Sequence, residues 1–228
     1  MRLLGHGASL AAFRWDCVYL LARLLADDRQ DVKALGAAAK DMLDQVGQER
    51  AALEAVEDNA VIASALLGNA DKARDKVLIA MGGVARAMDK PTYAVLFPKL
   101  NPSRTARLTV AEESTEIARI LAELAKLPAD HALRVGYESE LAGAESATKT
   151  AAAQQNQAAV ALSIQRSQMG RFKLGIDKGR LEIHGHLVAL LKDKADADSF
   201  FRPTSSSPGE EEKKEPAAPA APPVPANP

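Results

Sequence analysis

Apolar residues recur three and four positions apart along nearly the whole chain up to about residue 200, and the recurring residue is most often alanine. A spacing of three and four is the period of an amphipathic helix, whereas a strand alternates every second residue. Alanine is also the strongest helix former. The pattern therefore predicts an all-α protein, built as an antiparallel bundle of four to five helices, some of them long. Two clear stripes are Leu10, Phe13, Cys17, Leu20 and Leu24, and Leu35, Ala39, Met42 and Val46.

The size and composition are those of a globular protein. A chain of 228 residues holds one or at most two domains. Its 47% hydrophobic and 26% charged residues are far from the composition of a disordered protein. The formal net charge of -1 argues against a globally basic nucleic-acid binder and against a polyanion mimic, although local patches stay open.

The sequence predicts a cytoplasmic protein with no membrane partner. Cys17 is the single cysteine, so it cannot form an internal disulfide, which agrees with a reducing compartment. We expect it to be a small buried core residue rather than a reactive thiol. His6, Arg14 and Asp16 interrupt any signal-like apolar segment near the start. No window approaches the roughly 18 uncharged apolar residues of a membrane span.

The composition changes near residue 202. The sequence divides there into a helical bundle, residues 1–202, and a C-terminal segment, residues 203–228, rich in proline, alanine and glutamate. Such a composition cannot bury enough apolar surface to offset the entropy of ordering, which predicts a disordered tail. The tail is expected to be solubilising, with a tether or a docking peptide for a proline-reading partner as alternatives.

Residues that typically begin or end helices divide the helical part into segments. An acidic stretch at residues 27–31 is expected to end the first helix, and Ser9 lies near its start. Gly68 and Asn69 predict the end of one helix and the beginning of the next, which must stop before Pro91. A capping box, Thr109 to Glu112, begins another helix. A last long helix is expected from about residue 130 to 194, with a bend or break among the glycines between residues 169 and 185.

The connection at residues 91–108 contains three prolines together with several large apolar residues. Connections this long without secondary structure of their own are uncommon and tend to be functional or packed onto the body. We expect a packed lid over one end of the bundle, with Leu96 and Phe97 mostly buried. The alternative is that it forms part of an interaction surface, for which Tyr93 and Phe97 are candidates.

No residue pattern indicates catalysis, a cofactor or a metal. None of the four histidines follows a glutamate by three residues, so the helical di-metal motif is missing. His184 and His186 are two positions apart and point to opposite sides of a helix. No phosphate-binding loop or Cys/His cluster is present in the sequence. These negatives predict a protein that is not an enzyme and uses no cofactor or metal.

The basic interval, residues 166–194, is the one electrostatic asymmetry. Clustered cations could bind a nucleic acid or another polyanion through its phosphates. The alternative is a solvated helix face, whose charges pair with acidic residues of the tail at 210–212. Candidate surface residues here are Arg166, Arg171, Lys173, Lys178 and Arg180.

The sequence therefore favours a non-enzymatic helical scaffold or protein–protein interaction protein, which binds a protein partner or associates with itself. Nucleic-acid or polyanion binding through residues 166–194 is the alternative. An enzyme with a site under the 91–108 connection is a third hypothesis.

Overall fold

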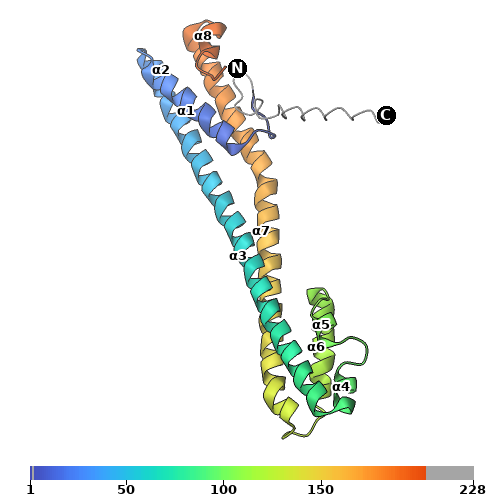
Figure 1. The fold of residues 1–228 in the computed structure, drawn as a ribbon. Helices are drawn as coiled ribbons and strands as arrows, with labels where there is room; N and C mark the ends of the chain where they lie inside the picture. Colours follow the sequence, from blue (N-terminus) through green and yellow to red (C-terminus); the bar gives the residue numbers. More distant parts are fainter. Residues whose placement is uncertain (2, 204–228) are drawn as a thin grey trace, which may run out of the picture. The chain divides into compact units, whose positions relative to one another are not determined.

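The computed structural model describes residues 1 and 3–203 of the chain (Figure 1). The described residues form helices and no strand, which confirms the all-α prediction. No described helix is both long and apolar enough to cross a membrane. The predicted disordered tail lies outside the described residues from position 204 onward. The helices are α1 (Leu10–Ala26), α2 (Gln30–Ala34), α3 (Gly36–Met88), α4 (Lys90–Leu96), α5 (Pro102–Thr105), α6 (Val110–Leu124), α7 (Ala132–Leu191) and α8 (Lys194–Asp198).

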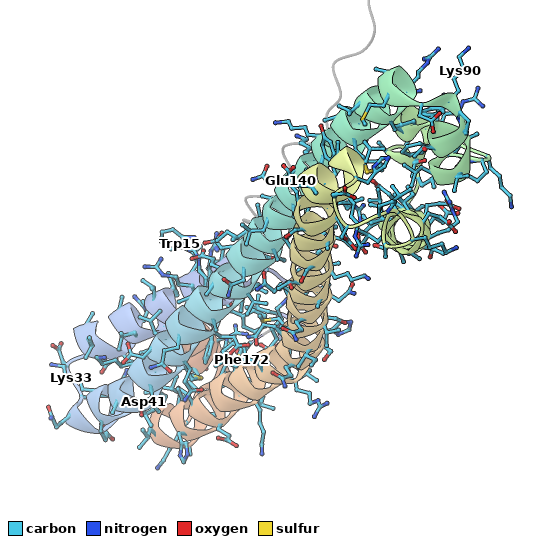
Figure 2. The ribbon with its side chains drawn as sticks, turned by 90° about the horizontal axis from the view of Figure 1, so that it is seen from below. Trp15, Lys33, Asp41, Lys90, Glu140 and Phe172 are labelled. Atoms are coloured by element: carbon cyan, nitrogen blue, oxygen red, sulfur yellow. The ribbon has the colours of Figure 1, made fainter. Side chains whose placement is uncertain are left out.

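The chain forms two compact units, and the antiparallel helices α3 and α7 contribute to both (Figures 1 and 2). Unit 1 comprises residues 1–47 and those from 172 onward, and unit 2 comprises residues 48–171. In Figure 2, Trp15 on α1 and Asp41 on α3 mark unit 1, and Glu140 on α7 marks unit 2.

Unit 1 buries the two stripes that the sequence analysis identified. The side chains of Phe13, Cys17 and Leu20 on α1 are fully buried against α3 and α7. Burial raises the pKa of the Cys17 thiol to about 11, so the thiol is neutral and unreactive at pH 7. Ser9 caps α1 by accepting a hydrogen bond from the amide of Ala12 at 3.1 Å. The rest of this core consists of Leu24, Val32, Ala39, Met42, Val46, Ile176, Ile183, Leu187, Ala197, Phe200 and Phe201.

Unit 2 packs α4 and α6 against the adjoining parts of α3 and α7. The capping box of α6 is confirmed, because Thr109 and Glu112 exchange both of its hydrogen bonds. Its core consists of Leu78, Met81, Ala85, Leu96, Phe97, Ile117, Ile120, Leu124, Leu133 and Leu141.

Two predicted helix breaks are absent. Helix α3 continues through Gly68 and Asn69, and α7 continues without a break through the glycines between residues 169 and 185, where a bend or a break was expected. A glycine inside a helix costs about 1 kcal/mol relative to alanine, whereas ending a helix exposes several backbone groups and requires a new nucleus. The packing of α3 against α7 outweighs the smaller cost. Helix α3 does end at Met88, before Pro91 as expected.

The connection at residues 91–108 is packed, as predicted, but it is more ordered than a lid without secondary structure. It contains most of α4 and all of α5, capped by the side chains of Asp89 and Asn101, which accept backbone hydrogen bonds at 2.9 Å. Leu96 and Phe97 are buried, which confirms the burial expected for them.

Candidate interaction surface and buried ion-pair networks

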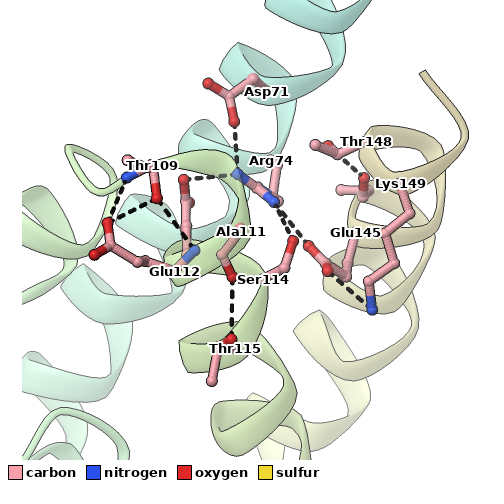
Figure 3. Close-up of polar contacts among 12 residues, drawn as sticks. Asp71, Arg74, Thr109, Ala111, Glu112, Ser114, Thr115, Glu145, Thr148 and Lys149 are labelled. Atoms are coloured by element: carbon pink, nitrogen blue, oxygen red, sulfur yellow. Dashed lines mark hydrogen bonds and ion pairs between the residues drawn. The ribbon is translucent and has the colours of Figure 1, made fainter. Parts of the chain in front are cut away.

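A fully buried arginine joins three helices of unit 2 (Figure 3). Arg74 on α3 donates from Nη2 to Glu113 on α6 at 2.7 Å and to Asp71 at 2.6 Å. Its Nη1 donates to Glu145 on α7 at 2.9 Å and to the Ser114 hydroxyl at 3.1 Å. One guanidinium thus connects α3, α6 and α7, which is the geometry in which the planar fork of arginine is most effective.

The network around Arg74 holds more carboxylates than cations. The carboxylate oxygens of Asp71, Asp75 and Glu113 lie within 4.8 Å of one another. Asp75 Oδ1 and Glu113 Oε1 are buried and accept no hydrogen bond from a described donor. Burial raises the pKa of Glu113 to about 8, although the Arg74 guanidinium opposes the shift, and burial also raises the pKa of Asp75. Glu113 is therefore protonated at pH 7 and can donate its proton to Asp75.

Asp71, Asp75 and Glu113 have the spacing that a cation would require, but we assign no metal to them. The Arg74 guanidinium already donates to two of the three carboxylates, so positive charge is present at these oxygens. A proton on Glu113 satisfies the remaining pair without a second cation.

A second buried arginine lies in unit 1. Arg180 on α7 donates from Nη2 to Asp16 on α1 at 2.7 Å and from Nη1 to Asp177 at 2.5 Å. Asp177 also accepts hydrogen bonds from the backbone amides of Leu4 and Gly5, at 3.1 Å and 2.7 Å. Burial raises the pKa of Asp16, and the charge of Arg180 opposes that shift. The network ties the segment before α1 to α7.

Both arginine networks are structural. The side chains of Arg74 and Arg180 are at most 2% exposed, and each is held by carboxylates of neighbouring helices. A guanidinium that is closed to solvent and held by carboxylates offers no access to a substrate. The two networks hold neighbouring helices in register. A partner can bind only to the exposed residues outside them.

The predicted aromatic candidates belong to the core rather than to an exposed surface. Phe97 is 6% exposed and its ring centroid lies 5.3 Å from that of the half-buried Tyr93. Arg119 on α6 donates to the carbonyls of Leu96 at 2.7 Å and Val95 at 3.3 Å, which fixes the end of α4. Phe97 therefore stabilises unit 2 from inside.

The basic candidates do not all lie on a solvated face. Arg180 was the wrong choice for a surface residue, because it is buried within the network with Asp16 and Asp177. The apolar spacing of α7 placed it on the buried face, where a charge needs a partner.

The remaining four basic candidates are exposed or half-buried and are divided between the units. Arg166 pairs with Glu57 at 3.0 Å, and Arg171 is exposed, both in unit 2. In unit 1, Lys173 donates to the carbonyl of His6 and Lys178 lies 3.8 Å from Glu182.

Arg74 and the buried acidic partners of both arginines were not predicted from the sequence. Arg74 lies three residues before Val77 and four after Ala70, so it continues the apolar stripe of α3 as a single charged member. Asp16 similarly lies beside Phe13 and Cys17 on the buried face of α1. A lone charge inside an apolar stripe was the available signal, since such a charge must find a partner when the helix packs.

The middle of unit 2 exposes large apolar side chains. In this part of unit 2, Gln155 Nε2 on α7 donates a hydrogen bond to Ser64 Oγ on α3 at 3.2 Å. A cleft beside this contact is lined by Leu162 and by small and polar residues of both helices. The apolar side chains that point away from the contact between α3 and α7 are exposed to solvent. They are Val61, Ile62 and Leu66 on α3, exposed by 70%, 55% and 48%, and Val160 and Ile164 on α7, exposed by 58% and 51%.

No family model, curated protein or solved structure matches the chain. The function is therefore inferred from the contacts and the exposed side chains of the described residues.

Proposed function

We propose that the protein is a non-enzymatic helical interaction protein, whose α3 and α7 form a coiled-coil hairpin that binds a protein partner along its exposed middle section. The observation that carries the proposal is the exposure of Val61, Ile62 and Leu66 on one helix and of Val160 and Ile164 on the other. Large apolar side chains left exposed on a helix are typical of positions that a protein partner covers.

The spacing of the seam supports a coiled coil. On α3, the positions protected from solvent alternate three and four residues apart, which is the heptad repeat. The same alternation is found on α7. These positions are Leu53, Val56, Ala60, Ala63 and Leu67 on α3, and Thr148, Ala151, Gln155, Ala158 and Leu162 on α7.

Several seam positions hold small residues, while Val61 and Ile62 lie outside the seam. Ala60, Ala63 and Ala151 bring little apolar surface to the contact between the helices. Val61 and Ile62 each carry an apolar side chain whose complete burial is worth about 1.5–3 kcal/mol. A partner that covers Val61 and Ile62 would therefore add apolar burial that the hairpin alone does not provide.

The two rival functions have less support. Polyanion binding through residues 166–194 could not use Arg180, because Arg180 is buried in ion pairs with Asp16 and Asp177. An enzyme site under the 91–108 connection would need open space there, and Leu96 and Phe97 fill the core at that place.

Site-specific photocrosslinking in the native cell tests the proposal. A photoreactive amino acid at position 62 should give a discrete crosslinked protein band, whereas the same amino acid at position 41 should not, because Asp41 is exposed in unit 1 away from the proposed surface. Replacing Val61 and Leu66 by serine should abolish the band at position 62. Equal labelling at both positions, or none at position 62, would refute the proposed surface.

A further inference from the structure

The outward face of α3 in unit 2 has an ordered arrangement of charge. Glu54 and Asp58 lie at one end, Val61 lies inside, and Lys72 and Lys76 lie at the other end. All five are exposed, and positions 54, 58, 61, 65, 68 and 72 follow one another four and three residues apart, so they share one stripe of the helix. The face is acidic, then apolar, then basic along about 33 Å of helix, and Glu54 also pairs with Arg50 one turn earlier at 2.8 Å.

The arrangement is symmetric about Ala65. Glu54 lies as far before Ala65 as Lys76 lies after it, and Asp58 stands in the same relation to Lys72. Two copies of this helix that run antiparallel and meet at Ala65 would therefore place every acidic residue opposite a lysine of the other copy.

The centre of the face allows close approach. Ala65 has a small side chain, and a Cβ built at Gly68 would meet nothing within 4 Å. Small residues at the centre of the stripe permit helix axes at the short end of the 8–10 Å range. Ile62, which is 55% exposed, lies beside the stripe and can pack against the flank of the second copy.

We propose that the partner of this surface is a second copy of the chain, bound through antiparallel pairing of the outward faces of the two α3 helices with Ala65 on the two-fold axis. A two-fold interface uses the same patch on both copies, so the patch must be complementary to itself. The order acidic, apolar, basic meets this requirement. A net charge of only -1 adds little repulsion between copies. The proposal rests on the proposed function, because it names the occupant of the same exposed section.

Charge exchange in the full chain tests the pairing. One variant carries Lys72→Glu and Lys76→Glu, and the other carries Glu54→Lys and Asp58→Lys. Each variant alone places like charges opposite each other at four positions, so its dimer dissociation constant, measured by sedimentation equilibrium, should rise at least about tenfold. Mixed together, the two variants should recover the affinity of the unchanged protein, because every position then has an opposite charge again. Lys90→Glu with Lys99→Glu, exposed elsewhere in unit 2, makes the same change in net charge and should leave the dimer intact.

A cysteine on the proposed axis gives a second readout. In a Cys17→Ala background, Ala65→Cys should form a covalent dimer under mild oxidation, since the two thiols face each other on the axis. Ala153→Cys, exposed on α7, should not. A protein that is monomeric at about 100 μM, a mixture that does not regain affinity, or a disulfide at position 153 instead of 65 would each overturn the self-pairing. A crosslink from position 62 to a different protein would in that case preserve the proposed function while refuting its second copy.

Discussion

Arg74 on α3 donates a hydrogen bond to Glu113 on α6 at 2.7 Å, and neither side chain is more than 1% exposed. The carboxylates around Arg74 offset the cost of burying its charge, so the net contribution of the whole network to folding is small. Replacing Arg74 alone is strongly destabilising, because the buried carboxylates around it then lack a cation.

We expect Arg74→Met to destabilise the protein by about 3–5 kcal/mol, because it leaves the Glu145 carboxylate buried without its cation. The free energy of unfolding in urea, followed by circular dichroism at pH 7, measures the loss. Lys40→Met is the control: Lys40 also pairs with a carboxylate, Asp44, but both side chains are more than half exposed, and such a pair is worth about 0–1 kcal/mol. Similar losses of unfolding free energy in the two variants would mean that the contribution of the Arg74 network does not depend on its burial.

A second prediction concerns pH and Glu113. Its pKa of about 8 in the folded protein lies above its ordinary value of 4.5, so the folded state binds this proton more tightly than the unfolded state. The stabilisation from the bound proton is therefore complete below about pH 4.5 and is lost as the pH rises through 8. Glu113→Gln keeps a neutral side chain at every pH, so its melting temperature relative to the unchanged protein should rise between pH 5 and pH 8.5.

The control for that measurement is Glu140→Gln, which removes the same charge from an exposed position on α7. Its melting temperature should stay at a constant offset from that of the unchanged protein over the same pH range. Parallel curves for Glu113→Gln would show that Glu113 is ionised in the folded protein at pH 7 and shares no proton with Asp75.

The helices themselves could be predicted from the sequence because their signals are local. The stripe from Phe13 to Leu24, the cap at Ser9 and the capping box at Thr109 each depend on residues a few positions apart, and each was confirmed. The prolines at 91 and 102 indicated a break in the helical structure. Instead, each lies in the first turn of a short helix, α4 or α5, that is capped by Asp89 or Asn101.

The errors occurred where distant packing decides the outcome. Gly68 carries the local signal of a helix end, and only the length of α7 beside α3 shows why the helix continues. Arg180 carries the signal of a basic surface, and only the position of Asp16, on a helix more than 150 residues away in sequence, shows that it is buried. The partners of Arg74 come from three helices and could not be assigned from spacing along one.

A third prediction uses two adjacent glycines of α3. A Cβ at Gly82 would lie 2.1 Å from Pro102 Cγ, whereas a Cβ at Gly83 would meet nothing within 4 Å. Gly83→Ala should therefore stabilise the protein by up to about 1 kcal/mol through helix propensity. Gly82→Ala should destabilise it, because the rigid proline ring of α5 must move. Thermal unfolding of the two variants measures the difference, and stabilisation by both would show that α5 does not pack against α3 at this point.

The last prediction concerns the core side chain at the end of α4. Phe97 is 6% exposed and packs beside Tyr93 in the core of unit 2, so Phe97→Ala should cost about 3–5 kcal/mol of unfolding free energy. Val95, two residues earlier, is 53% exposed, and Val95→Ala should change stability by only about 0.5 kcal/mol. Urea unfolding of both variants provides the comparison. If Phe97 formed part of a binding surface instead, its removal would leave stability nearly unchanged, and the third hypothesis of a site under residues 91–108 would return.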